Sequence, residues 1–252
     1  MFTKTILSAT ALLAGVATAA TAPGFPIQVS QNLTVIYGNN TVSPGGELIP
    51  RPETAQRPTI SSPVWFADEQ GPGRCVLLMV DLDVPRNNSR VQLVHWIATN
   101  VTRSVPISAN TTGSPLVIPS DNPVPYLQPS PPVGDIPHSY TFILMAQPRN
   151  FSIPSVYDDL ADNRVGFNVS QFAADANLTT GIAATWITVQ NLTETPTNTS
   201  FPPPRPSPSP TGDGANSDGS ASGDASGMMI AGRTFWAAMS TTVLAVVFAI
   251  AL

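Results

Sequence analysis

The sequence predicts a mainly antiparallel β domain with one or two short helices, and three observations support this fold class. Apolar residues between Phe25 and Leu192 come in short runs bounded by Pro, Gly and Asn, as strands separated by turns do. These runs are rich in Val, Ile, Phe and Tyr, which suit a half-buried pleated surface. Few windows repeat their apolar residues every 3.6 positions, and frequent prolines confine helices to short pieces.

The expected elements can be placed in order along the chain. Strands are predicted over 33–37, 75–81, 92–101, 139–147 and 184–190. Short helices are predicted over 155–161 and 169–176. In the second of these segments Val169, Phe172 and Ala173 fall on one helical face, which indicates a helix with one buried side.

The folded domain is expected to extend over 21–194, between two hydrophobic ends that resemble processing signals. Residues 1–20 have the features of a secretory signal peptide, with one lysine, then the apolar core Ile6–Val16, then small residues. The apolar core is too short to span a membrane comfortably. We expect cleavage near Ala19 or Ala20 and entry into the secretory pathway.

The number of acceptor sequences for N-linked glycans also favours export. Ten Asn-X-Ser/Thr sequences occur, more than the asparagine content would give at random. Such sequences matter only in a protein that enters the secretory pathway. The candidate glycosylation sites are Asn32, Asn39, Asn87, Asn100, Asn110, Asn150, Asn168, Asn177, Asn191 and Asn198.

The C-terminal part predicts a stalk followed by a lipid-attachment signal. Residues 195–226 are rich in Pro, Ser and Gly and have little to bury, which is typical of an extended disordered segment. Residues 227–252 end in the apolar tail Phe235–Leu252, which no basic residue follows. A retained membrane span would normally be followed by Lys or Arg, so the pattern favours a glycosylphosphatidylinositol (GPI) signal with Asp224 as the candidate attachment residue. The expected location is the extracellular face of the plasma membrane or the cell wall.

Composition excludes several functional classes. Charged residues make up 11% of the chain, the net charge is −5 and no basic run occurs, so a nucleic-acid partner is not expected. The single cysteine, Cys75, excludes an intramolecular disulfide framework and lies in an apolar run that favours a buried structural thiol. Only two histidines, His95 and His138, are available for histidine-dependent chemistry.

Two short segments hold nearly all the residues that could do chemistry. The first is Asp81–Pro85, an apolar strand that ends in two carboxylates, and His95-Trp96 follows it. The second is Pro131-Pro132, which leads into His138–Tyr140. In order and spacing these four motifs resemble those of the phosphatidylethanolamine-binding protein family, also called the Raf-kinase-inhibitor-like family. The resemblance covers about 28–192.

The resemblance implies an antiparallel β-sandwich and a non-enzymatic pocket for a phospholipid head group or another small anion, with no cofactor and no metal. It also implies the ligand-binding residues Asp81, Asp83, His95, Pro131, Pro132, His138 and Tyr140. Three positions depart from the family pattern: Leu82 and Ser130 replace a proline and a glycine, and Ser139 replaces an arginine. The last change removes a permanent cation that would partner Asp83.

Elementary chemistry is consistent with this pocket. Imidazole and phenol groups donate hydrogen bonds to an anion without a fixed positive charge, and His95, His138 and Tyr140 are the candidate donors. Asp81 would orient one imidazole or accept a ligand ammonium group, and the two prolines would stiffen the rim. Without the resemblance, the same aspartates would be interpreted as turn residues and the histidines as ordinary packed residues.

Three other functions are compatible with parts of the sequence. A serine carboxypeptidase or other protease inhibitor is the main alternative, with the stretch Ser114–Asn122 as a possible exposed segment. A serine hydrolase is disfavoured because no Gly-X-Ser-X-Gly elbow is present, although a hidden triad would be compatible with the composition. A zinc site formed by His95, His138 and Asp81 is chemically acceptable, but the histidines lack the close helical spacing that usually marks such a site.

Overall fold

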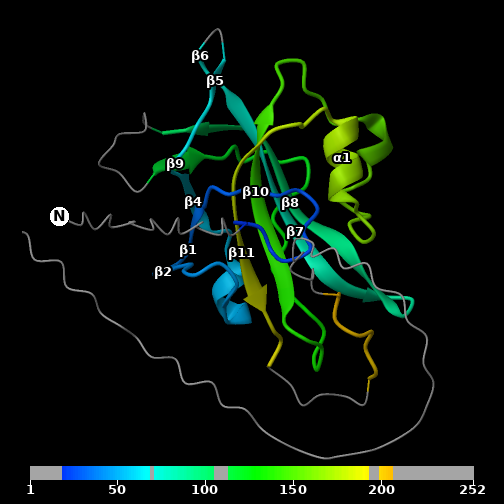
Figure 1. The fold of residues 1–252 in the computed structure, drawn as a ribbon. Helices are drawn as coiled ribbons and strands as arrows, with labels where there is room; N and C mark the ends of the chain where they lie inside the picture. The colour runs from blue at the N-terminus through cyan, green and yellow to red at the C-terminus, as the bar shows by residue number, and fades with distance from the viewer. Residues whose placement is uncertain (1–18, 69–70, 105–112, 193–198, 207–252) are drawn as a thin grey trace, which may run out of the picture. The chain divides into compact units, whose positions relative to one another are not determined.

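A computed structural model describes residues 19–68, 71–104, 113–192 and 199–206 of the chain (Figure 1). Most of the predicted signal peptide, most of the predicted stalk and the whole predicted GPI signal lie outside these residues, and their roles stay predictions. Within the described parts of the chain, no helix has the length and apolar content that crossing a bilayer requires.

The fold is built on a nine-stranded sheet whose long central strands are antiparallel. Its order is β2-β1-β4-β9-β8-β7-β10-β11-β3, and only the terminal pair of β11 with β3 is parallel. The central strands, which lie side by side in Figure 1, are β7 (Arg74–Arg86), β8 (Ser89–Arg103), β10 (His138–Gln147) and β11 (Gly181–Val189). The short strands are β1 (Thr34–Tyr37), β2 (Asn40–Thr41), β3 (Glu47–Leu48), β4 (Thr59–Ser62) and β9 (Ser114–Val117). A separate hairpin pairs β5 (Ala67–Asp68) with β6 (Gly71–Pro72).

The predicted mainly β fold class is confirmed, and each of the five predicted strands overlaps an observed one. The short strands β2, β3, β4 and β9 were not predicted, because runs of two to four residues carry too little apolar patterning. The β7–β8 hairpin turns at Asn87 and Asn88, whose φ values are +48° and +59°. Two successive positive φ values are typical of the type I′ turn, which Asn tolerates better than most residues.

Two hydrophobic cores occupy the opposite faces of β7. Val76, Leu78 and Val80 face the first core, whereas Leu77 and Met79 face the second, as the alternation of a strand requires. Because both faces are covered, β7 is a nearly continuous apolar run. Residues of the short strands β1 and β4 line the second core, so the curled sheet covers itself on that side.

The first core is closed by the one α-helix of the described residues, α1 (Val169–Asp175), which lies against the sheet in Figure 1. Its start is capped by Asn168, whose side chain accepts a hydrogen bond from the Gln171 amide. The prediction of a helix over 155–161 is wrong after the first turn. Only the 3-10 turn η2 (Ser155–Tyr157) forms there, after which the chain continues in hydrogen-bonded turns. A second 3-10 helix, η1 (Arg51–Ala55), precedes β4.

The lone thiol is buried as the sequence predicted. Cys75 lies at the start of β7 in the second core and is 0% exposed. Burial raises the pKa of this thiol well above its ordinary value. It is therefore protonated and inaccessible at neutral pH.

Residues 199–206, predicted to belong to a disordered stalk, instead contact the folded domain. Arg205 pairs with Asp83, and Arg90 donates hydrogen bonds to the carbonyl groups of Pro202 and Pro203. These contacts are made by arginine side chains and backbone carbonyls, and the extent of the predicted stalk stays a prediction.

Of the ten candidate glycosylation sites, Asn110 and Asn198 lie outside the described residues. Seven of the others are exposed and Asn191 is half-buried, so none of the eight described sites lies in the core. Glycosylation at these sites stays a prediction.

Candidate functional site

A cavity of about 280 Å³ lies at the ends of the central strands and contains most of the predicted site residues. Asp81 comes from β7, His95 from β8, and His138 and Tyr140 from β10. The loop between β9 and β10 closes the cavity with Leu127 and with Pro131 and Pro132. This loop is held along β8 by the pairing of Ile97 with Val124 and by a hydrogen bond from the Leu127 amide to the His95 carbonyl.

A β-bulge aims His95 into the cavity. Met79 of β7 pairs with Trp96, whereas the next residue, Val80, pairs with Val94, so His95 is the extra residue of β8. A bulge re-aims a side chain because it breaks the alternation of the strand. Trp96 thus faces the second core and Val94 the first, and His95 reaches the ligand cavity.

A second irregularity turns Asp83 away from the cavity. Asp81 pairs with Leu93, but the next recorded pair joins Val84 to Val91, so the register shifts across Asp83. Asp83 lines a separate cavity of about 150 Å³, beside Ser139 and Arg205. The structure therefore brings six of the seven predicted ligand-binding residues together and leaves Asp83 outside their cavity.

His138 lies between two carboxylates. Its Nδ1 is 2.8 Å from Asp81 Oδ2 and its Nε2 is 3.0 Å from Asp135 Oδ2. All three side chains are buried. Although burial alone would lower the pKa of His138, the hydrogen bonds and charges of Asp81 and Asp135 raise it above its ordinary value. The geometry thus favours an imidazolium that donates from both nitrogens, which leaves no N–H of His138 free for a ligand.

Asp135 and Arg90 belong to this site and were missed in the sequence. Arg90 makes a bidentate pair with Asp135, at 2.9 and 2.7 Å, and both side chains are almost fully buried. Although burial opposes ionisation, the bonds from Arg90 and His138 hold the pKa of Asp135 below its ordinary value. Asp135 could have been suspected from its position three residues before His138. No local signal marks Arg90, which lies on β8.

His95 has the opposite electrostatic character. Its Nδ1 lies 2.9 Å from the Leu127 carbonyl, so Nδ1 carries the proton and Nε2 of the neutral ring is an acceptor. Burial is the main cause of a pKa below the ordinary value, and the nearby Asp81, at 3.9 Å from Nε2, only partly opposes it. His95 therefore presents a free nitrogen to the cavity at neutral pH.

Tyr140 is the polar group of the site that lacks a partner. Its ring packs between the two imidazoles, with centroid distances of 5.0 Å to His95 and 6.4 Å to His138. Its hydroxyl is buried and has no partner at hydrogen-bonding distance and angle within the described structure, although the Asp81 carboxylate lies near enough to interact with it. Burial, together with the charge of Asp81, raises the pKa of this phenol, so the group stays an O–H donor. An unpartnered buried hydroxyl is costly unless a ligand or water satisfies it.

The rim combines proline rings with a hydroxyl. Pro131 is buried and Pro132 exposed, and both line the cavity, as predicted. Ser130, which replaces a glycine of the family pattern, also lines it and accepts hydrogen bonds from the Arg51 guanidinium at 3.2 and 3.3 Å. Arg51 therefore places a cation at the rim, where the sequence had not indicated one.

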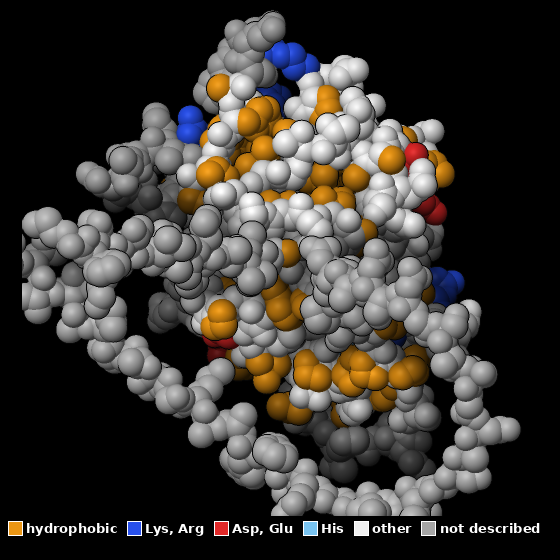
Figure 2. Space-filling view, viewed as in Figure 1, with side chains coloured by type: hydrophobic (Ala, Val, Ile, Leu, Met, Phe, Trp, Pro, Cys, Tyr) orange, Lys and Arg blue, Asp and Glu red, His pale blue; other side chains and the backbone are white. Residues whose placement is uncertain are grey.

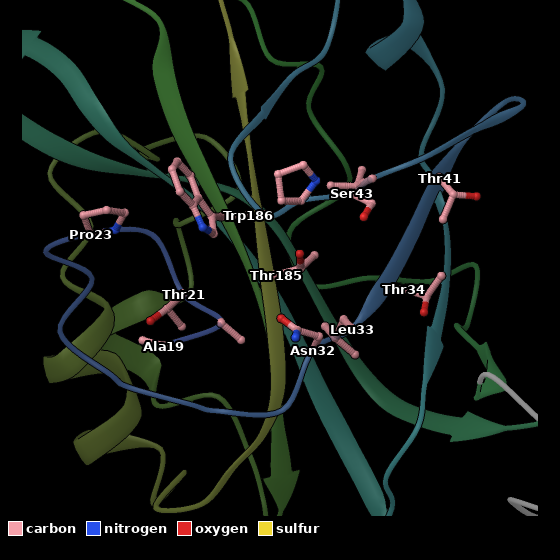
Figure 3. A pocket seen from close by; sticks show the side chains of 14 residues that line it. Ala19, Thr21, Pro23, Asn32, Leu33, Thr34, Thr41, Ser43, Thr185 and Trp186 are labelled. Atoms are coloured by element: carbon pink, nitrogen blue, oxygen red, sulfur yellow. The ribbon is translucent and has the colours of Figure 1, made fainter. Parts of the chain in front are cut away.

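A second, larger pocket of about 610 Å³ offers different chemistry (Figure 3). It is lined by hydroxyl, amide and apolar groups, including Asn32, Thr185 and Trp186, and none of its fourteen lining residues has a titratable side chain. Gly46, with φ of +89°, lets the backbone cross the Trp186 ring, because a Cβ there would lie 2.5 Å from it. Figure 2 shows few charged side chains among the coloured atoms of the face that it presents. The smaller cavity is therefore the better candidate for ligand chemistry.

The described residues contain no group of three or more His, Cys, Asp or Glu side chains arranged to hold a metal ion. The carboxylates near His138 are instead used in hydrogen bonds to Arg90, His138 and backbone amides. The described part of the site thus gives no support to the zinc hypothesis.

The curled sheet has a cavity lined by carboxylate and imidazole groups near the ends of its central strands. The chain belongs to the phosphatidylethanolamine-binding protein family, whose model matches residues 38–202. The match includes all seven predicted ligand-binding residues, as well as Arg90 and Asp135.

The chain is similar to two fungal proteins and shares its fold with a solved structure. Phomoidride biosynthesis cluster protein N of Talaromyces stipitatus is 29% identical over 180 residues, which cover 66% of this chain and 87% of that protein. A protein of the same name from another fungus is 30% identical over 123 residues, covering 47% and 53%. The solved carboxypeptidase Y inhibitor, complexed with its cognate proteinase, superposes with a TM-score of 0.50 at 19% identity, covering 65% and 85%. This last similarity shows a shared fold.

Proposed function

We propose that this protein is a non-enzymatic binding protein for phospholipid head groups or other small anions, held at the outer cell surface. The observation that carries the proposal is the buried, unpartnered Tyr140 hydroxyl, which lines the same cavity as the free nitrogen of His95. Family membership supports the same ligand class.

The arrangement suits an anion that brings its own proton or acquires one on binding. The Tyr140 hydroxyl donates to an anionic oxygen, and His95 Nε2 accepts from a P–OH group or donates after protonation. The fixed charges of Asp81, His138, Asp135 and Arg90 are paired with one another, so they add little net potential. Inside the cavity recognition therefore depends on neutral donors, and the Arg51 cation lies only at the rim, which favours a small head group over a highly charged ligand.

The test is isothermal titration of the purified protein with phosphoethanolamine and with vesicles that contain acidic phospholipids. Y140F removes only the hydroxyl, and H95Q removes the free nitrogen. We expect each variant to bind about tenfold more weakly, the loss typical of one good hydrogen bond. Y157F is the matched control, because the Tyr157 hydroxyl bonds to Asp175 outside the cavity. Binding by wild type that neither variant weakens would contradict the proposed site.

A hydrolytic role is disfavoured by the same geometry. A serine nucleophile needs a neutral imidazole nitrogen as general base. Both nitrogens of His138 bond to carboxylates, and the free nitrogen of His95 faces a cavity in which Ser130 is the only serine among its lining residues. Labelling by a fluorophosphonate probe that S130A abolishes would overturn the non-enzymatic assignment.

Protease inhibition is the second candidate, favoured by the structural similarity to the carboxypeptidase Y inhibitor. The exposed segment expected over Ser114–Asn122 is only partly free. Its first half is β9, which pairs with both β4 and β8, although Val117 is 49% exposed. Unchanged carboxypeptidase activity in the presence of excess purified protein would count against this function.

A further inference from the structure

The segment 199–206 contacts residues next to the candidate site through two arginines. One is its own Arg205, and the other is Arg90 of β8. Arg205 Nε is 2.7 Å from Asp83 Oδ1, its second terminal nitrogen is 3.5 Å from Oδ2, and its Nη1 donates to the Pro23 carbonyl at 2.9 Å. Arg90 donates to the carbonyl oxygens of Pro202 and Pro203, at 2.6 and 3.1 Å. These polar contacts tie a proline-rich segment, in which Phe201 and Pro202 are half-buried, to the folded domain.

The two arginines lie at the ends of one chain of hydrogen bonds that passes through the ligand cavity. From Arg205 the chain runs to Asp83, whose amide donates to Asp81 Oδ1 at 2.7 Å. Asp81 then holds His138, and His138 contacts Asp135. Arg90 completes the chain at Asp135, as described above, and the backbone of 202–205 joins its two ends into a closed ring.

Asp83 depends on Arg205 for its charge balance. Its side chain is only 4% exposed, and besides Arg205 it accepts one hydrogen bond, from the Ser139 amide. A buried carboxylate without a cation is costly, so the loss of Arg205 would force Asp83 to move. This movement disturbs the Asp83 amide that orients Asp81. Arg205 occupies the place that the replacement of an arginine by Ser139 had left without a cation.

We propose that Arg205 is a positioning residue of the ligand site, which acts through Asp83 and Asp81 to hold His138 and the Tyr140 side of the cavity in place. The segment 199–206 is then a functional part of the domain rather than the start of a stalk. The inference on ligand affinity rests on the proposed function, whereas the inference on His138 does not. This proposal gives a ligand-site role to Arg205, which lies beyond the family match at 38–202.

The test uses the full secreted chain with R205Q, R205K, R205Q/S139R and the control R57Q, since Arg57 is exposed beyond η1. The first readout is the pair of imidazole N–H signals of His138 in nitrogen-15 NMR spectra, which are visible only while both hydrogen bonds persist. We expect both signals in wild type and R57Q and their loss or broadening in R205Q. The double variant should restore them, because Ser139 lines the same small cavity as Asp83 and Arg205.

The second readout is affinity for phosphoethanolamine, which we expect R205Q to weaken about tenfold and R205Q/S139R to restore. The order parameters of the Phe201 and Arg205 amides report separately on whether the segment stays docked. If R205Q releases the segment but keeps both His138 signals, the positioning role is wrong. If R205Q loses the His138 signals that wild type shows, but wild type binds no phosphoethanolamine, the proposed function fails and the positioning role stands.

Discussion

His138 and His95 lie in one cavity and have opposite charge preferences because their hydrogen-bond partners differ. Two carboxylates face His138, whereas a backbone carbonyl faces His95. The first environment stabilises an imidazolium and the second a neutral ring. The two histidines, which are equivalent in the sequence pattern, therefore have different proposed roles. His138 orders the site, and His95 has a nitrogen available to bind the ligand.

The lowered pKa of His95 predicts how anion binding depends on pH. A bound anion favours protonated His95, so proton uptake accompanies binding and affinity rises as pH falls through the pKa that His95 has in the complex, toward its lowered pKa in the free protein. We expect about a tenfold gain for each unit by which the anion raises the pKa of His95. Titration calorimetry from pH 5.5 to 7.5 in two buffers of different ionisation enthalpy measures the uptake. H95Q should remove the His95 part of this dependence, and an identical profile in H95Q would contradict the assignment.

The raised pKa of His138 predicts a pH-dependent contribution to stability. A histidine whose pKa is raised by folding stabilises the native state fully below its unfolded pKa of about 6.5, and the contribution is lost as pH rises through the folded pKa. H138Q should therefore lower the free energy of unfolding by about 3 kcal/mol near pH 6 and by less near pH 9. Urea unfolding of both proteins at the two pH values checks this. A difference that stays constant with pH would show that the imidazolium is not the stabilising species.

At the scale of elements, α1 contributes its stability through one aromatic residue. Phe172 is fully buried and its ring packs against Tyr157 and Phe167, at centroid distances of 5.0 and 5.4 Å. F172A should cost about 3–5 kcal/mol, because the helix cannot collapse into the space left. Val156, on the neighbouring turn η2, is 71% exposed, so V156A should change stability by less than about 0.5 kcal/mol. Thermal unfolding of the pair gives the comparison, and a similar loss in both would contradict the packing argument.

The elements differ in how far the sequence could predict them. β7 and β10 contain long apolar runs rich in β-branched and aromatic residues, and this composition, rather than periodicity, predicts buried strands. The bulge at His95 cannot be read from periodicity, because it is a mismatch between two strands that appears only when they pair. For the same reason the sequence could place Asp83 beside Asp81 but not foresee that its side chain leaves the cavity.

Long-range polar contacts were the other kind of information missing from the sequence. Arg90 and Asp135 are 45 residues apart, and Arg205 and Asp83 are 122 apart. Hydrophobic patterning carries no signal for such pairs, since each residue alone has the features of an ordinary surface charge. The family motifs identified six of the residues that line the cavity, but the charges that hold these residues in place became visible only in the fold.

At the scale of the whole molecule, the predicted GPI anchor remains to be tested. We expect phosphatidylinositol-specific phospholipase C to release the protein from intact cells, because every residue after the attachment residue, 225–252 if this is Asp224, would have been replaced by lipid. Immunoblotting of the medium before and after treatment measures the release. An 18-residue tail retained as a span would instead keep the protein on the cells, and mass spectrometry would then find peptides from 235–252 in the mature protein.

The burial of Cys75 has a practical consequence for following the motions of the molecule. The chain has no other thiol, and this one lies where β7 pairs with β8 and β10. A maleimide can reach it only when the centre of the sheet opens, so the rate of labelling under native conditions counts those openings. The rate of Cys75 labelling in wild type therefore measures sheet opening without an engineered probe. A lower rate in the presence of a bound anion would show that the ligand stabilises the central strands.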